Sequence, residues 1–283
     1  MPYQDSTANS VIIPQVWSAR FYEVLRASQP FLESIITNRD YEGEITDLGN
    51  ILNISTITDF DDATELPEGS QGDTEVATVS GQQLTINKRT YKDFKVTKTA
   101  LKQSLPFMDS LREKAVFAIN KRIQQVIIDN TIPSASAPDH QIGYTSSTTL
   151  ALVDFLAAKK LLDAANVDMV GRAAVLGSNQ WNDLFNFGTT SGNFLSRDFI
   201  PSGSPMTTGQ FQTDLLGFTP RMTTVVGNTC YFLHPSYLTV AIQEQLNVAE
   251  YDLGSTGERG FRVNSDLLWG LKLTDNKRVV TIS

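Results

Sequence analysis

Residues 40–97 alternate between apolar and polar side chains over two long arms, yet they carry too few large apolar groups to form a core of their own. The alternation is typical of strands exposed on one face, and the tip around Pro67 and Gly69 is almost entirely polar. The apolar positions of the two arms are Ile45, Leu48, Ile51, Ile54, Ile57, Leu84, Ile86, Tyr91, Phe94 and Val96. This pattern predicts a long β-hairpin. An isolated two-stranded ribbon is marginally stable in water and exposes its edges, so we expect the hairpin to lie on a neighbouring molecule.

Charge is divided unevenly between this hairpin and the segment that follows it. Residues 40–75 hold eleven acidic side chains and no Lys or Arg, whereas residues 86–122 hold ten basic and three acidic ones. Two interpretations remain open: a solvated acidic loop followed by a helix with a basic face, or complementary surfaces that meet on assembly. Under the second interpretation, the predicted inter-subunit contact residues are Asp59, Asp61, Asp62, Glu65, Glu68, Lys88, Arg89, Lys92, Lys114 and Lys121.

Residues 104–131 predict one long amphipathic helix. Ser104 can act as its N-cap, Pro106 falls in the first turn, and Pro133 ends the pattern. The apolar stripe, at steps of three or four residues, consists of Met108, Leu111, Ala115, Ile119, Ile123 and Val126. The polar side is assigned to Arg112, Glu113, Lys114, Lys121 and Gln124. Such a helix is longer than a compact domain of this size needs, and it offers a long apolar surface to other elements.

The rest of the chain predicts a compact α/β unit and a set of late strands. In residues 143–235, a helix with Leu152, Phe155, Leu156, Lys159 and Leu162 at helical spacing precedes a strand at 172–176 and a second helix capped by Ser178. Strands at 218–226 and 229–233 follow, separated by a Gly227-Asn228 turn. Later strands at 247–253, 261–273 and 278–282 need a partner, and we expect them to fold back onto the long helix. The α/β unit is then an insertion.

Composition and motifs exclude several function classes. The 283 residues carry a formal net charge of -8, which argues against tight wrapping of nucleic acid, and no run is apolar enough to span a membrane. The N-terminus lacks a secretory signal, so synthesis in the cytoplasm is expected. Cys230, the one cysteine, is expected to be buried and inert; His140 is expected to be exposed, and His234 to be a hydrogen-bonding residue at a strand end.

No chemistry of an enzyme is indicated. The chain has no phosphate-binding G-x-x-x-x-G-K-[ST] motif and no G-x-S-x-G motif. The acidic tip fails the pattern of a calcium loop because Thr64 stands where that loop requires glycine. The three tryptophans, Trp17, Trp181 and Trp269, lie in apolar patterns that favour a core. We therefore predict no catalytic residues, no cofactor and no metal.

The order of these elements resembles that of the major capsid protein of tailed bacteriophages, which has the Hong Kong 97-like fold. The resemblance is best in IIPQVWSARFYEVLR at residues 12–26, and in TPRMTTVVGNTCYFLHPSYLTVAIQ at 219–243 running into FRVNSDLLWGLKLTDNKRVVTIS at 261–283. It implies an α+β fold. The implied parts are an N-terminal arm at 1–39, an extended loop at 40–97, a peripheral domain at 98–142 and 236–283, and an axial domain at 143–235.

The resemblance also implies a function. The chain would assemble into pentamers and hexamers of an icosahedral head shell around double-stranded DNA, and would be located in the virion after assembly in the host cytoplasm. It implies a portal and in some cases decoration proteins as partners, with weak non-specific contact to the packaged DNA. It also implies either a separate scaffolding protein or prior cleavage of a scaffolding segment. Some relatives cross-link through a lysine of the extended loop, but here no lysine precedes Lys88 at its base. The alternative is an encapsulin-type shell with a protein cargo, because that class shares the fold.

Overall fold

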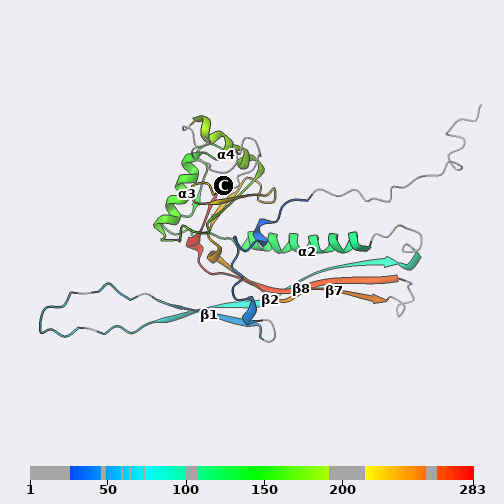
Figure 1. Cartoon of the computed structure of the whole chain (residues 1–283), viewed down its shortest axis with the longest axis horizontal. Coiled ribbons are helices and arrows are strands. Elements are labelled where there is room, and N and C mark those ends of the chain that lie inside the picture. Colours follow the sequence, from blue (N-terminus) through cyan, green and yellow to red (C-terminus); the bar gives the residue numbers. More distant parts are fainter. Residues whose placement is uncertain are drawn as a thin grey trace, which may run out of the picture.

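The computed structural model shows two β-sheets, a long helix between them and a hairpin that projects far from both (Figure 1). The structure describes residues 26–45, 49–58, 60–63, 65–72, 74–99, 108–190, 214–252 and 260–283. Most of the predicted N-terminal arm, together with Trp17, Ser104 and Pro106, therefore lies outside the described residues.

The first sheet has four strands in the order β1-β2-β8-β7, and all neighbours are antiparallel. Its strands are β1 (Ile51–Ile57), β2 (Val79–Thr97), β7 (Leu238–Asp252) and β8 (Gly260–Leu273). β2 is long enough to pair with β1 through its first part and with β8 from Ile86 onward, with an irregularity between Ile86 and Lys88. The return arm of the hairpin is thus built into the body of the protein, which the alternation alone did not indicate.

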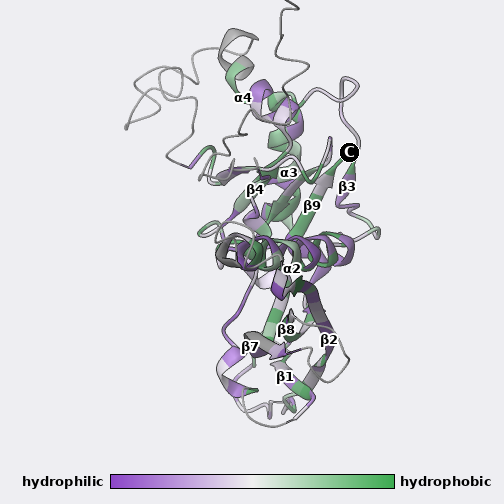
Figure 2. Ribbon diagram, turned by 90° about the vertical axis from the view of Figure 1, so that its right-hand side faces the viewer, coloured by the Kyte–Doolittle hydropathy of each residue, from purple (hydrophilic) through white to green (hydrophobic). Residues whose placement is uncertain are grey.

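The long helix α2 (Met108–Asn130) packs on one face of this sheet (Figure 2). Ile119, Ile123 and Ile127 are buried in one core with β-strand residues that include Val240, Leu267 and Trp269. The expected return of the late strands onto the helix is therefore confirmed for β7 and β8. The apolar stripe differs at its end, because Ile127 is buried where Val126 was expected.

The second sheet has five strands in the order β3-β9-β6-β4-β5 and is covered by two helices (Figure 2). Its strands are β3 (Gln141–Ile142), β4 (Ala173–Leu176), β5 (Thr219–Met222), β6 (Cys230–Leu233) and β9 (Val279–Ile282), and its helices are α3 (Leu152–Ala164) and α4 (Ser178–Thr190). Three rings, Phe155, Phe218 and Phe232, meet edge to face in its core, with centroids 4.9, 5.3 and 5.4 Å apart. Such edge-to-face pairs favour one fixed packing arrangement.

Two predictions about strand pairing were wrong. β9 pairs with β6, so the chain ends in the second sheet instead of staying with the long helix. β5 and β6 do not form a hairpin across Gly227 and Asn228, because β4 lies between them, parallel to β5 and antiparallel to β6. Sheet order depends on contacts distant in sequence, which a local apolar run does not encode.

Three single-residue expectations were also wrong. Leu156 is 43% exposed, because the face that α3 buries runs through Phe155, Ala158 and Leu162. His140 is buried, and its Nδ1 lies 3.1 Å from the carbonyl oxygen of Val279, to which it donates. Gln124 of α2 is buried, not on the polar side of the helix.

Cys230 is fully buried in β6, as predicted, and its Sγ lies 3.2 Å from the Tyr144 hydroxyl. Burial raises the pKa of its thiol to about 12, so the reactive thiolate is scarce at neutral pH. We expect a thiol reagent at pH 8 to modify Cys230 at least about 100-fold more slowly in native protein than in denatured protein. A stopped-flow or mass-spectrometric time course in buffer and in guanidinium measures this ratio, and equal rates would contradict the buried position.

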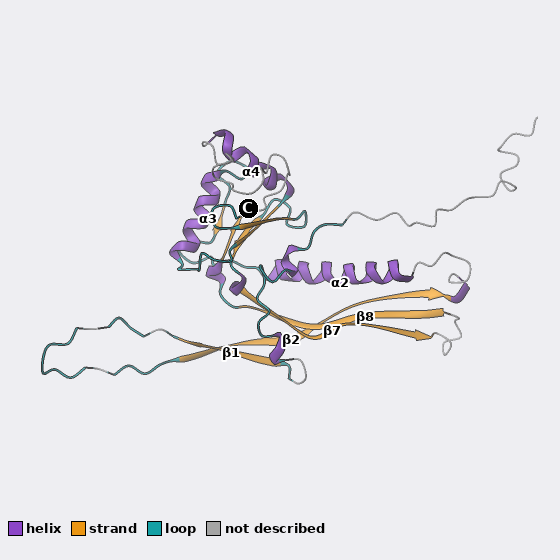
Figure 3. Ribbon diagram, viewed as in Figure 1, coloured by secondary structure: helices purple, strands orange, loops and turns teal. Residues whose placement is uncertain are grey.

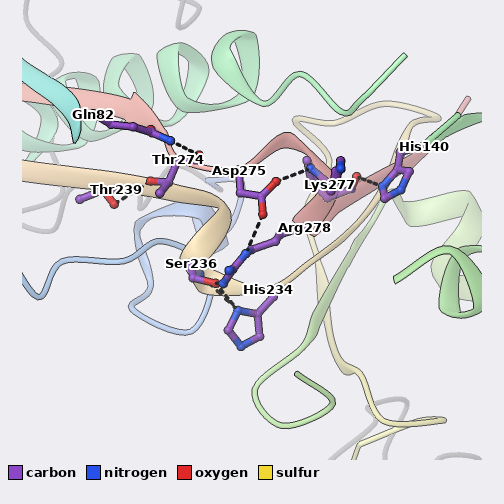
Figure 4. A network of polar contacts seen from close by, with 10 residues as sticks. Gln82, His140, His234, Ser236, Thr239, Thr274, Asp275, Lys277 and Arg278 are labelled. Atoms are coloured by element: carbon purple, nitrogen blue, oxygen red, sulfur yellow. Dashed lines mark hydrogen bonds and ion pairs between the residues drawn. The ribbon is translucent and has the colours of Figure 1, made fainter. Parts of the chain in front are cut away.

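A polar network joins the two sheets where the chain crosses between them, at η3 (Pro235–Tyr237) and η5 (Asn276–Arg278) (Figure 4). Arg278 donates through Nε to Asp275 at 3.0 Å and through Nη1 to the Ser236 hydroxyl at 2.5 Å. The Ser236 hydroxyl lies 2.6 Å from His234 Nδ1, which also accepts from the Ser236 backbone N–H. His234 is therefore the hydrogen-bonding residue at a strand end that the sequence predicted.

The network predicts a pH effect on stability. Burial, and then the positive charge of Arg278, lower the pKa of His234 below its ordinary value of 6.5. The unfolded chain therefore binds the proton more readily, so stability is fully present above pH 6.5 and falls as the pH drops below it. We expect His234→Gln, which keeps a hydrogen-bonding side chain, to lose less thermal stability between pH 8 and pH 5.5 than the parent. Calorimetry at both pH values measures the difference, and an identical loss in both proteins would count against this role of His234.

Candidate assembly surfaces

The hairpin continues beyond its two strands as a bare extended loop (Figure 3). The Thr58 backbone N–H donates to the Thr78 carbonyl oxygen at 3.0 Å, and every described residue from 55 to 81 is exposed. The predicted acidic contacts that the structure describes all lie on this loop and are exposed: Asp61, Asp62, Glu65 and Glu68. Asp59 lies outside the described residues. The carboxylates of this loop are therefore accessible to another molecule.

The same loop presents apolar side chains to solvent. Among the large apolar residues that are exposed, five lie on the loop or at its base: Ile57 at 65%, Phe60 at 63%, Leu66 at 49%, Val76 at 84% and Val79 at 63%. Exposed apolar groups gathered on one projecting segment mark an interaction surface. The sequence-based prediction of an almost entirely polar tip did not take account of Phe60 and Leu66, although both residues lie in this part of the sequence.

The basic contact residues predicted on β2 are Lys88, Arg89 and Lys92, and Arg89 already has a partner within the chain. Arg89 donates through Nε to Asp266 of β8 at 2.9 Å, and this hydrogen bond raises the pKa of the guanidinium. Arg262 of β8 pairs with Asp93 of β2 in the same way, with Nε 3.1 Å from Oδ2. These cross-strand ion pairs stabilise the outer face of the first sheet. Lys88 lies opposite Trp269 in the ladder between β2 and β8, and Lys92 is exposed.

The two helical candidates, Lys114 and Lys121, are exposed on α2, and Lys121 borders a pocket of about 410 Å³. This α2 pocket lies between the helix, residues 26–29 and the loop after β5, and its lining includes Arg26, Gln29, Phe117, Lys121, Gln124 and Thr224. The Arg26 guanidinium carbon stands 4.8 Å from the centroid of the Phe117 ring. The site was not foreseen, because its three walls are distant in sequence.

The structure does not bring the acidic loop and the helical lysines together within one chain. The hairpin projects in one direction while α2 runs over the other end of the first sheet (Figure 1). In the described ranges, the ion pairs of this region join β2 to β8 and do not involve the acids of the loop. The described residues therefore show no pairing between loop acids and helix lysines within the chain, and the pairing between chains stays a prediction.

Two further observations concern the part of the chain that the structure describes. No three His, Cys, Asp or Glu side chains there converge as ligands of a metal ion. None of its helices is both long and apolar enough to cross a bilayer.

Comparison with solved structures identifies proteins with a similar fold. A protein of Mycobacterium phage Che8 is 22% identical with a TM-score of 0.74, and the match covers 96% of this chain and 97% of that one. The capsid structure of cyanophage P-SCSP1u matches at 9% identity with a TM-score of 0.74, covering 97% and 93%. The capsid asymmetric unit of cyanophage Pam1 matches at 13% identity with a TM-score of 0.72, covering 96% of each chain. No family model and no curated protein matches the sequence.

These matches span almost the whole of both chains, so they compare complete architectures and not a shared fragment. The fold is that of phage capsid proteins. It is the α+β Hong Kong 97-like fold, with the long helix, the sheet beneath it and the projecting hairpin that the resemblance implied.

Proposed function

We propose that this chain is the major capsid protein of a tailed bacteriophage, a structural subunit that assembles with copies of itself into an icosahedral head shell. The observation that carries the proposal is the match over nearly the full length of two phage capsid chains. The hairpin supports it independently, because a loop with every described residue exposed has no role in its own chain's core.

The proposal assigns a role in the shell to the hairpin and to each of the two sheets. Residues 40–97 serve as the extended loop, whose part beyond β1 and β2 reaches a neighbour. The first sheet, to which β1 and β2 also belong, serves with α2 as the peripheral domain. The second sheet with α3 and α4 serves as the axial domain around the symmetry axes of pentamers and hexamers. β9 belongs with this axial unit, since it pairs with β6.

Further partners belong to the same proposal. A portal, a scaffolding protein and decoration proteins are those that the resemblance implies, and the virion is the implied location. The net negative charge of the chain suits a container from which DNA must later leave. A basic inner surface would bind the phosphates tightly by releasing their counterions and would hold the genome in place.

Electron microscopy of purified particles, with analysis of their content, tests the proposal. We expect closed icosahedral shells from the expressed chain, alone or with a scaffolding protein, and double-stranded DNA inside particles taken from an infected host. Small shells filled with one protein would favour the encapsulin alternative. Protein that stays monomeric with every candidate scaffold would contradict a shell function of either kind.

A further inference from the structure

The α2 pocket contains a buried amide whose hydrogen-bonding needs are unmet. Gln124 is 1% exposed, and both its Nε2 and its Oε1 lack a hydrogen-bond partner within the described residues. Gln29 Nε2, on another wall, is also buried and without a partner there. Buried polar groups are nearly always hydrogen-bonded in folded proteins. Because Nε2 and Oε1 of Gln124 belong to one planar group, the pocket suits an occupant that presents an acceptor and a donor side by side.

The lining of the pocket is positively charged, although the chain as a whole is acidic. It includes Lys121 and Arg26 and no carboxylate, whereas the chain carries a formal net charge of -8. Neither cation forms an ion pair with any residue that the structure describes. Two such cations favour an anionic ligand, and phosphate groups accept charge-assisted hydrogen bonds from both side chains.

The pocket also provides flat surfaces beside the amide. Phe117, Lys121 and Gln124 follow one another on α2 at steps of four and three residues, which places them in a row on one face of the helix. The row spans about 10 Å, from the rise per residue of an α-helix. The Arg26 guanidinium carbon lies 4.8 Å from the centroid of the Phe117 ring. Unpaired nucleobases stack on aromatic rings and on guanidinium planes.

We propose that the α2 pocket binds a nucleotide, either free or as an unpaired unit of a nucleic acid. The amide of Gln124 pairs with the edge of the base; with adenine, it donates to N7 and accepts from the N6 amino group. Lys121 binds the phosphate, and Arg26 adds charge and a flat surface. The cavity of about 410 Å³ falls within the range of ligand sites, roughly 300–1,000 Å³. The inference goes beyond the proposed function, because such binding requires the folded chain and no shell.

Two other occupants fit the pocket less well. Duplex DNA keeps its bases paired and outside the pocket, where they do not reach an amide that is 1% exposed. An acidic peptide supplies carboxylates and backbone hydrogen-bonding groups, but it lacks the flat base that suits Arg26 and Phe117. Both remain as outcomes of the test.

Equilibrium dialysis of the full chain with radiolabelled dAMP tests the proposal. We expect saturable binding of one dAMP per chain. Deoxyadenosine, which lacks the phosphate, and deoxyribose 5-phosphate, which lacks the base, should each bind about tenfold more weakly or worse. A single-stranded oligonucleotide of dA compared with dAMP distinguishes the two sources, and tighter binding of the strand assigns the site to nucleic acid.

Three variants separate the contacts. Gln124→Met should lower the affinity for dAMP about tenfold and leave that for deoxyribose 5-phosphate unchanged. It should keep or raise the melting temperature, because it removes a buried polar group without a partner. Lys121→Gln should weaken dAMP and deoxyribose 5-phosphate alike, about tenfold. Lys114→Gln is the matched control: Lys114 is exposed on the same helix outside the pocket, so binding should not change.

Four results would overturn the proposal. They are no saturable binding of dAMP at millimolar concentration, equal binding of dAMP and deoxyribose 5-phosphate, binding of duplex as tight as that of single strand, and displacement of dAMP by a capped Glu-Glu dipeptide at lower concentration than by unlabelled dAMP. The last would assign the pocket to an acidic peptide. Because none of these measurements requires assembly, their failure is distinct from a failure to form shells.

Discussion

Replacing Ile119 with Asp is expected to leave the protein unfolded or insoluble. Ile119 is 1% exposed and lies in the core that α2 shares with Val240, Leu267 and Trp269. The change removes a large apolar side chain, which costs about 2–5 kcal/mol, and adds a charge that no buried partner neutralises. The sum is comparable to the whole stability of a typical domain, about 5–15 kcal/mol. Ile123→Asp, at 5% exposure in the same core, should behave alike.

The measurement is soluble yield, with circular dichroism of whatever remains soluble. Arg122→Asp is the matched control, because it places the same residue beside Ile123 on the exposed face of the same helix. It should stay folded, with a loss of under about 1 kcal/mol from helix propensity. Ile119→Val should cost only about 0.5–1.5 kcal/mol and should still assemble. Soluble, assembling Ile119→Asp would show that this stripe does not face the core.

Helix α2 was predictable from the sequence because its information is local. Apolar residues at steps of three and four place Ala115, Ile119 and Ile123 on one face whatever the rest of the chain does, and all three are buried. The end of the stripe was less predictable. Near its C-terminus the helix meets both sheets and residues 26–29, so its buried surface widens to include Gln124 and Ile127.

The pairing of the strands could not be predicted in the same way. Three of the four residues of β9, Val279, Val280 and Ile282, are apolar, which indicates a buried strand, but the same pattern would suit either sheet. The turn at Gly227 and Asn228 favoured a hairpin, yet β6 finds its partners in β4 and β9, both distant in sequence. The burial of His140 follows from the same topology, since its partner carbonyl belongs to Val279.

Only part of the candidate assembly surface could be predicted from the sequence. Charge counting identified the acidic loop, because an excess of one sign needs no structure to be noticed. The ion pairs Arg89–Asp266 and Arg262–Asp93 could not be predicted from the sequence, because they depend on the register between β2 and β8. Because Arg89 is held by Asp266, its reversal to Glu would also damage the sheet. Lys121 is therefore a cleaner probe of assembly than the set Lys88, Arg89 and Lys92.

Deleting residues 59–73 and closing the hairpin with a short turn is expected to abolish shells while the subunit stays folded. The deletion lies within 55–81, where every described residue is exposed, so it removes no side chain of the three cores. The pairing of β1 with β2, from Ile51 opposite Thr85 to Ile57 opposite Val79, is retained. We expect a melting temperature within a few degrees of the parent's, slow thiol reaction at Cys230, and monomers or small oligomers in sedimentation and by microscopy.

The size of this effect follows from repetition. An exposed ion pair contributes only about 0–1 kcal/mol, and the few carboxylates of one loop would therefore shift a single contact modestly. In a closed shell every subunit both gives a loop and receives one, so the loss recurs at each position and the shell as a whole loses many such contacts. Replacing Asp61, Asp62, Glu65 and Glu68 with Asn or Gln, without shortening the loop, should weaken assembly less than the deletion, because Phe60 and Leu66 remain. It should also reduce the salt dependence of assembly, since screening would have fewer charges to act on. A deletion variant that still assembles normal closed particles would show that the hairpin is not the inter-subunit arm, and the remaining case for a shell would rest on the fold alone.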